Sequence, residues 1–170
     1  MDAAKDKRSW MITGIHHVAI HTPQFDRMRK FYERAFGFVP ITEPGGWSNS
    51  PEIDRAIGVS GSAARTVMMR AGRMCLEIFE YASPPSRDGA PLRPNDHGYT
   101  HFAVDVTDLD AVYADLVEAG MRFGDNHAIG EGGIRAIYGY DPDGNVIEIQ
   151  QLTPDHPYHL DNISRAGQSG

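Results

Sequence analysis

The sequence is short of several features that mark particular protein classes. Its single cysteine, Cys75, cannot form an internal disulfide. No stretch approaches the roughly 18 consecutive apolar residues of a membrane-spanning helix, and the charged residues 1–8 do not provide the apolar core of a signal peptide. The 16 Lys and Arg residues are outnumbered by 23 Asp and Glu residues, a net charge of −7, which has the wrong sign for neutralising a nucleic-acid backbone. We therefore expect a soluble, cytoplasmic globular protein with no nucleic-acid or membrane partner.

An internal repeat is the most informative feature that is present. When the chain is shifted by 84 residues against itself, residues 14–21 (GIHHVAIH) align with residues 98–105 (GYTHFAVD). The glycine, the second histidine and the alanine coincide. In each half an amphipathic helical pattern follows, and a strand with one glutamate between aliphatic residues closes the half, with Glu77 in the first and Glu148 in the second. The repeat predicts an α+β fold of two tandem βαβββ modules.

Local signals predict where the helices begin and end. Thr22 and Pro23 suit the N-cap and the first position of a helix that ends before Gly37. Thr107 and Asp110 have the spacing of a capping box for a second helix, which we expect to end at Gly120.

The two halves differ in length. Sixty residues separate His17 from Glu77 but only 47 separate His101 from Glu148, so the first half holds about 13 extra residues. We expect the insertion within residues 44–62, with a short helix that starts at residue 50 and ends at Gly58. In the second half, the Asp143-Gly144 pair predicts a hairpin before the last strand.

The expected boundaries are an N-terminal extension (1–10), a single domain (11–152) made of module one (about 11–82), a proline-rich connector (about 83–97) and module two (about 98–152), and a polar C-terminal arm (153–170).

Four ionisable residues share the same kind of strand position. Alternate side chains of a strand point to the same face, and His17, Glu77, His101 and Glu148 each occupy the face opposite the larger aliphatic residues. A carboxylate within an apolar strand is costly unless it is paired, protonated or bound to a cation. Two imidazoles with two carboxylates form a mixed shell that suits a divalent transition metal. A single histidine or glutamate is more often structural, so it is the duplication that favours a metal site.

Several motifs, taken in order, resemble the vicinal oxygen chelate superfamily. This superfamily includes glyoxalase I, methylmalonyl-CoA epimerase, extradiol ring-cleaving dioxygenases, fosfomycin-resistance proteins and bleomycin-binding proteins. The similarity covers about residues 11–152 and rests on residues 16–20 (HHVAI), 31–32 (FY), 36–37 (FG), 76–78 (LEI), 98–104 (GYTHFAV) and 141–148 (DPDGNVIE).

The resemblance implies that the two modules form a metal-binding cup. One divalent ion (Ni, Co, Zn, Mn or Fe) would be held by His17, Glu77, His101 and Glu148, with two positions left for water or for adjacent oxygens of a small-molecule substrate. In the isomerases of this superfamily a metal-binding glutamate also serves as the base, so Glu148 or Glu77 is the candidate catalytic base. Members commonly associate in pairs, and a homodimer is therefore expected.

Three functions are consistent with this resemblance. The leading one is an isomerase, epimerase or lyase that works through a metal-chelated enolate with a glutamate base. The second is an extradiol-type ring-cleaving dioxygenase, because residues 137–144 resemble those enzymes and place a candidate catalytic residue, Tyr138, ten residues before Glu148. Those dioxygenases use two histidines and one carboxylate, so Glu77 argues against this alternative. The third is a drug-binding resistance protein, although such binders typically lack the metal ligands.

Two positions separate the sequence from glyoxalase I itself. That enzyme has an arginine four residues after the first metal ligand and an asparagine four residues after the first glutamate ligand. His21 and Tyr81 stand at these positions here. The two differences argue against a glutathione-linked substrate.

Overall fold

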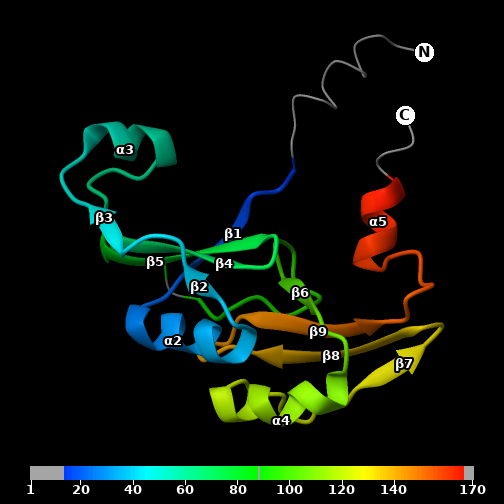
Figure 1. Cartoon of the computed structure of the whole chain (residues 1–170). Helices are drawn as coiled ribbons and strands as arrows, with labels where there is room; N and C mark the ends of the chain where they lie inside the picture. Colours follow the sequence, from blue (N-terminus) through cyan, green and yellow to red (C-terminus); the bar gives the residue numbers. More distant parts are fainter. Residues whose placement is uncertain (1–13, 88, 167–170) are drawn as a thin grey trace. The chain divides into compact units, whose positions relative to one another are not determined.

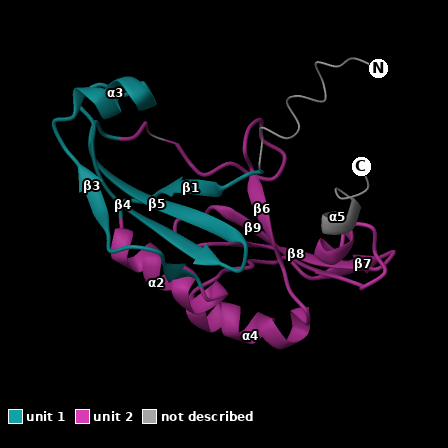
Figure 2. Ribbon diagram, turned by 45° about the horizontal axis from the view of Figure 1, so that its top comes forward, with its two compact units in different colours: residues 1–23, 38–85 teal, residues 24–37, 86–170 magenta. Residues whose placement is uncertain are grey.

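The structure, a computed structural model, describes residues 14–87 and 89–166 (Figure 1). The described chain divides into two compact units, each with its own sheet: unit 1 comprises residues 14–23 and 38–85, and unit 2 comprises residues 24–37, 86–87 and 89–166 (Figure 2). The predicted α+β class is confirmed. No helix in the described part of the chain is long and apolar enough to cross a bilayer.

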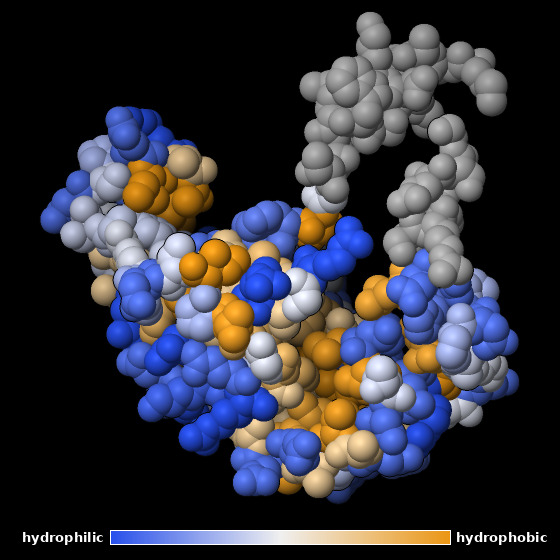
Figure 3. Space-filling model, viewed as in Figure 1, coloured by the Kyte–Doolittle hydropathy of each residue, from blue (hydrophilic) through white to orange (hydrophobic). Residues whose placement is uncertain are grey.

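Unit 1 is built on a sheet in the order β1-β5-β4-β2, with β3 also paired to β4. β1 runs parallel to β5, and the other pairs are antiparallel. The helix α3 buries none of its residues, and Figure 3 shows apolar and hydrophilic groups side by side on its surface. The elements are β1 (His17–His21), β2 (Val39–Pro40), β3 (Gly45–Trp47), α3 (Pro51–Ile57), β4 (Ala63–Ala71) and β5 (Met74–Ser83).

Unit 2 repeats this plan with a sheet in the order β6-β9-β8-β7. β6 runs parallel to β9, and the pairs of β8 with β9 and with β7 are antiparallel. The last helix, α5, lies in the segment predicted as a polar C-terminal arm. The elements are α2 (Phe25–Phe36), β6 (His101–Asp105), α4 (Leu109–Ala119), β7 (Ile129–Glu131), β8 (Ile134–Tyr140), β9 (Val146–Leu152) and α5 (Leu160–Ala166).

The helix α2 follows β1 along the chain but belongs to unit 2, where it packs against α4. Its apolar stripe at Phe25, Met28, Phe31 and Tyr32 is buried. Gly37 ends the helix in the left-handed conformation, with φ 66°, and its N–H bonds back to carbonyls of the last turn. This is the usual glycine termination of a helix, and it confirms the predicted end of α2.

The predicted N-caps of the two long helices are wrong by one or two residues. Thr22 is fully buried and its N–H donates to the carbonyl of Phe79 at 2.8 Å, so the chain stays bound to β5 and the helix begins later, with Gln24 at the N-cap. In α4 the cap is Asp108 rather than Thr107, because the Asp108 carboxylate accepts a hydrogen bond from the N–H of Ala111 at 3.0 Å.

The expectations for the insertion and for the last hairpin are confirmed. α3 has Ser50 as its N-cap and ends at Gly58. β8 and β9 pair across a connection that contains Asp143-Gly144, and Gly144 has a positive φ of 96°.

The alternation along the two closing strands is as predicted. Leu76 and Ile78 of β5 and Ile147 and Ile149 of β9 are 0% exposed. The glutamates between them therefore point to the opposite face of each sheet, where they are partly exposed.

Candidate metal centre

In unit 1 the sheet register brings a histidine and a glutamate together. β1 lies beside β5 in parallel, with Ala19 opposite Glu77, so His17 approaches Glu77 along a diagonal. The distance from His17 Nε2 to Glu77 Oε2 is 3.4 Å. The Glu77 side chain is 20% exposed, so its carboxylate is partly withdrawn from water.

Unit 2 contains the same arrangement, made by the equivalent strands. Ala103 of β6 lies opposite Glu148 of β9, and His101 Nε2 is 3.3 Å from Glu148 Oε2. The Glu148 side chain is 17% exposed. The duplication seen in the sequence is therefore also a duplication of side-chain geometry.

The hydroxyl groups that hold the two glutamates differ. In unit 1 the Thr66 hydroxyl donates to Glu77 Oε1 at 3.0 Å, so each oxygen of Glu77 has its own neighbour. In unit 2 the Tyr138 hydroxyl donates to Glu148 Oε2 at 3.1 Å, and this is the oxygen that also faces His101. Glu148 Oε1 accepts no hydrogen bond from the described residues.

Tyr138 contacts both members of the unit 2 pair. Its hydroxyl is 3.4 Å from His101 Nε2, and the two rings meet edge to face with centroids 5.0 Å apart. Burial and the neighbouring Glu148 carboxylate raise the pKa of Tyr138. At neutral pH it is therefore a protonated phenol that can donate a hydrogen bond to the carboxylate.

Thr66 was not identified from the sequence, although a signal for it exists. A tight turn at residues 72–73 joins β4 to β5, and counting back from the turn places Met68 opposite Glu77 and Thr66 opposite Phe79. Directly opposed residues of antiparallel strands share a face. Thr66 is thus a polar residue of β4 diagonal to Glu77, and Arg70 is the other.

The donor atoms of each pair fit a divalent ion. Two ligands about 2.1 Å from one ion lie about 3 to 3.4 Å apart at octahedral or tetrahedral angles, and the two observed N···O distances are 3.4 and 3.3 Å. Within residues 14–87 and 89–166 no group of three or more His, Cys, Asp and Glu side chains is placed to hold an ion. Each unit thus presents one His–Glu pair, and the joint metal site of His17, Glu77, His101 and Glu148 stays a prediction.

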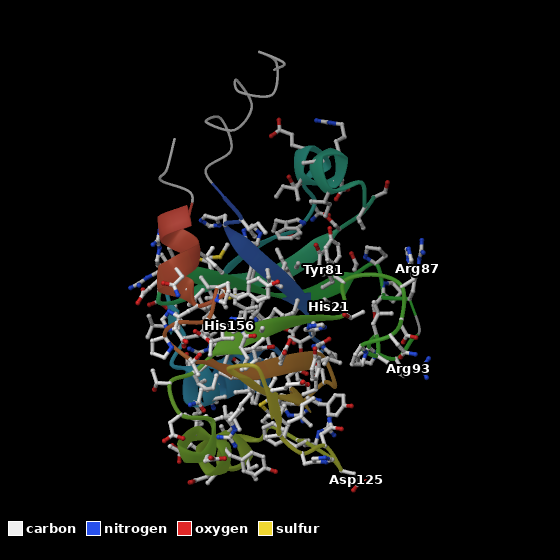
Figure 4. All side chains as sticks on the ribbon, turned by 90° about the vertical axis from the view of Figure 1, so that its right-hand side faces the viewer. His21, Tyr81, Arg87, Arg93, Asp125 and His156 are labelled. Atoms are coloured by element: carbon white, nitrogen blue, oxygen red, sulfur yellow. The ribbon has the colours of Figure 1, made fainter. Side chains whose placement is uncertain are left out.

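The two residues that separate the chain from glyoxalase I lie together in unit 1. The rings of His21 and Tyr81 meet edge to face with centroids 5.5 Å apart (Figure 4). The N–H of Tyr81 also points to His21 Nδ1 at 3.4 Å. Burial, with a smaller contribution from Glu77, raises the pKa of Tyr81.

Comparison with known proteins shows the family to which the chain belongs. The family model described as the Glyoxalase/Bleomycin resistance protein/Dioxygenase superfamily matches residues 14–149. The chain belongs to this superfamily. The resemblance inferred from the motifs is therefore confirmed.

Individual relatives extend the comparison. The chain is 33% identical over 157 residues to a 2-epi-5-epi-valiolone epimerase of an Actinomyces species, covering 85% of this chain and 82% of that protein. A glyoxalase family protein from Bacillus cereus superposes with a TM-score of 0.73 at 19% identity, covering 83% of this chain and 95% of that one. The fosfomycin resistance protein FosX of Listeria monocytogenes, solved with Mn(II) and sulfate, has a TM-score of 0.54 at 16% identity, covering 88% of this chain and all of that one.

Proposed function

We propose that the protein is a divalent-metal-dependent epimerase or isomerase that moves a proton on a carbon next to a carbonyl group. The observation that carries the proposal is the pair of His–Glu sites, one in each unit, with nearly equal N···O distances of 3.4 and 3.3 Å. The 33% identity to a protein named as an epimerase supports this choice over a lyase or a dioxygenase. The substrate is a small molecule with a carbonyl and a hydroxyl oxygen on adjacent carbons.

The ion would be held by His17, Glu77, His101 and Glu148. Two partly buried carboxylates, if brought together in one site, would repel each other without a cation, and imidazole with carboxylate suits Mn, Fe, Co, Ni or Zn. When bound, the ion supplies stabilisation of the negative charge that develops on the substrate oxygen.

Glu148 is the residue that takes the proton. Its Oε2 accepts a hydrogen bond from Tyr138, while Oε1 accepts none from the described residues and is left to accept the proton. Glu77 is held at both oxygens, by Thr66 and by His17, so it suits the role of a fixed ligand. The Tyr138 phenol keeps the Glu148 carboxylate oriented while the proton is transferred.

A second copy of this chain is the proposed protein partner. Ile15 lies two residues before His17 and so just ahead of the edge strand β1, and it is 93% exposed. Tyr99 lies two residues before His101, just ahead of the edge strand β6, and it is 103% exposed. Equivalent exposed residues beside both histidines suit a homodimer contact close to the site. Light scattering should give twice the monomer mass, and a Tyr99→Ser variant should shift toward the monomer.

The reaction is tested by hydrogen exchange. Zinc-loaded protein in deuterated water is incubated with 2-hydroxycyclohexanone or hydroxyacetone, and loss of the C–H signal next to the carbonyl is followed by NMR. We expect catalysed exchange that falls about a thousandfold in Glu148→Gln. Glu80→Gln, on the opposite face of β5, is the matched control and should retain the rate.

Two outcomes would contradict these assignments. Full exchange by Glu148→Gln would remove Glu148 as the base. Absence of exchange by the wild-type protein with zinc, manganese and nickel, together with oxygen uptake on catechol by the iron-loaded protein, would replace the isomerase with the dioxygenase.

A further inference from the structure

A cluster of aromatic rings lies on the same sheet face as the His17–Glu77 pair. Trp47, Phe79 and Tyr81 form a triangle with ring centroids 5.7 to 5.9 Å apart, and His21 meets Tyr81 at 5.5 Å. All three large rings are only partly buried. We call Trp47, Phe79, Tyr81 and His21 the aromatic wall.

The strand register places the aromatic wall next to Glu77, the candidate metal ligand of β5. Phe79 and Tyr81 follow Glu77 on β5 at steps of two residues, so each ring is about 7 Å further along the same face. Trp47 of β3 and Tyr81 of β5 both lie opposite Ala64 of β4. The small Ala64 side chain lets the two rings meet above it and is itself 7% exposed.

The Trp47 ring is held by a hydrogen bond from its indole N–H. Its indole N–H donates to the Ser62 hydroxyl at 2.8 Å, and Asp54 accepts hydrogen bonds from the Ser62 hydroxyl and from the Ser62 N–H. The Tyr81 hydroxyl, in contrast, makes no hydrogen bond with the described residues. The wall thus offers rigid ring faces and one unused hydroxyl.

The fold does not require these rings. In unit 2 the positions two and four residues after the glutamate are Gln150 and Leu152, and the position four residues after the histidine is Asp105. The same sheet is therefore built without an aromatic cluster. The packing needs of a βαβββ module therefore do not explain why unit 1 has an aromatic cluster beside the His17–Glu77 pair.

We propose that the aromatic wall binds the carbon face of a saturated ring substrate, such as a cyclitol or a cyclic hydroxyketone. The adjacent oxygens of the ring would lie at the His17–Glu77 end, and the C–H groups of the ring would rest on Phe79 and Tyr81. The negative face of an aromatic ring attracts weakly positive C–H bonds, and removal of such a face from water adds to the affinity. The proposal rests on the proposed function and names the substrate class of that site.

The test compares a ring with an open chain that carries the same oxygens. Binding of 2-hydroxycyclohexanone and of hydroxyacetone is measured with zinc-loaded protein by calorimetry and by the fluorescence of Trp47. These measurements use a Trp10→Phe background, so Trp47 is the remaining tryptophan. We expect the cyclic probe to bind about tenfold more tightly and to change the Trp47 emission.

Variants that replace a ring by an aliphatic side chain test the contribution of each ring. Phe79→Leu and Tyr81→Leu should each lower the affinity for the cyclic probe about fivefold and leave that for hydroxyacetone unchanged. Tyr113→Leu, which removes a stacked ring from α4 of unit 2, is the matched control and should change neither affinity.

If the preference for the ring is absent, or is equal in the wild-type protein and in the wall variants, the wall serves packing alone and the proposal is overturned. A leucine variant that fails to fold is replaced by Tyr81→Phe, which must then keep the ring preference. Failure of the proposed function is recognised separately, because it would abolish proton exchange on both probes, whereas failure of the wall proposal leaves exchange intact.

Discussion

The two units place a histidine beside a glutamate by the same strand register, but they surround the pair differently. Unit 1 holds Glu77 with the aliphatic hydroxyl of Thr66, whereas unit 2 holds Glu148 with the phenol of Tyr138. The aromatic wall continues the site only in unit 1. The comparison teaches that the backbone plan and the candidate ligands are kept while the neighbouring residues have diverged. On the proposed function, unit 1 would bind the substrate and unit 2 would supply the group that transfers the proton.

The largest expected effect separates the two glutamates. Glu148→Gln should lower the rate of proton exchange about a thousandfold because the base is lost, whereas Glu77→Gln should weaken metal binding and reduce the rate less at saturating zinc. Exchange is followed by NMR, and bound metal is measured by elemental analysis after dialysis. If both variants lose the same exchange rate and the same amount of bound metal, Glu148 and Glu77 have the same role and the proposed division between base and metal ligand is wrong.

The second effect concerns a buried carboxylate that stabilises the connection between β8 and β9. Asp141 is 0% exposed and accepts hydrogen bonds from the Tyr32 hydroxyl, the Asn145 amide and the N–H groups of Asp143 and Asn145. The equivalent connection of unit 1 is a short turn at residues 72–73.

Asp141→Ala leaves these donors without an acceptor and should lower the free energy of unfolding by about 3 kcal/mol. Urea denaturation followed by circular dichroism measures the change. Asp143→Asn, in the same loop, is the control and should cost less than about 1 kcal/mol. A loss below 1 kcal/mol in Asp141→Ala would show that water replaces the missing acceptor.

A third experiment sharpens the difference between the two hydroxyl donors. Tyr138→Phe should lower the exchange rate about tenfold, because one hydrogen bond to a charged group is lost at the proposed base. Thr66→Val should lower zinc affinity about tenfold, because the orientation of a ligand is lost, and should change the rate at saturating zinc about twofold at most. Competition with a fluorescent chelator measures the affinity. The reverse pattern would exchange the roles of the two units.

Much of this organisation follows from the sequence, for particular physical reasons. Alternation along a strand is a local property, so the faces of His17, Glu77, His101 and Glu148 could be predicted. The membership of α2 in unit 2 could not, because the order of elements does not say which neighbours a helix packs against.

The residues around the His17–Glu77 pair could not be predicted from the sequence for a related reason. Thr66 and Trp47 are brought to the site by pairing between strands, and this pairing becomes readable only when the turn register is known. The predicted N-cap of α2 is wrong because Thr22 is held by the β5 backbone, a contact from outside its own helix.

The smallest expected effect concerns the position four residues after His17 and after His101, where the two units have different residues. His21 stands there in unit 1 and Asp105 in unit 2. Asp105 Oδ1 is buried and has no hydrogen-bond partner among the described residues. Burial raises the pKa of Asp105, and the nearby His159 offsets this in part. Because the folded state favours the protonated acid, the contribution of Asp105 to stability is present below the unfolded pKa of about 3.8 and is lost as the pH rises through the folded pKa.

Asp105→Asn should therefore raise the melting temperature at pH 7 by no more than about 2 °C, since solvent screens a partly exposed carboxylate. The gain should shrink as the pH falls toward 3.8. Differential scanning fluorimetry between about pH 3.5 and about pH 8 measures it, with the exposed Asp125→Asn as the control. A gain that is independent of pH would mean that the asparagine stabilises through a new hydrogen bond, and that the charge at this position of unit 2 costs no stability.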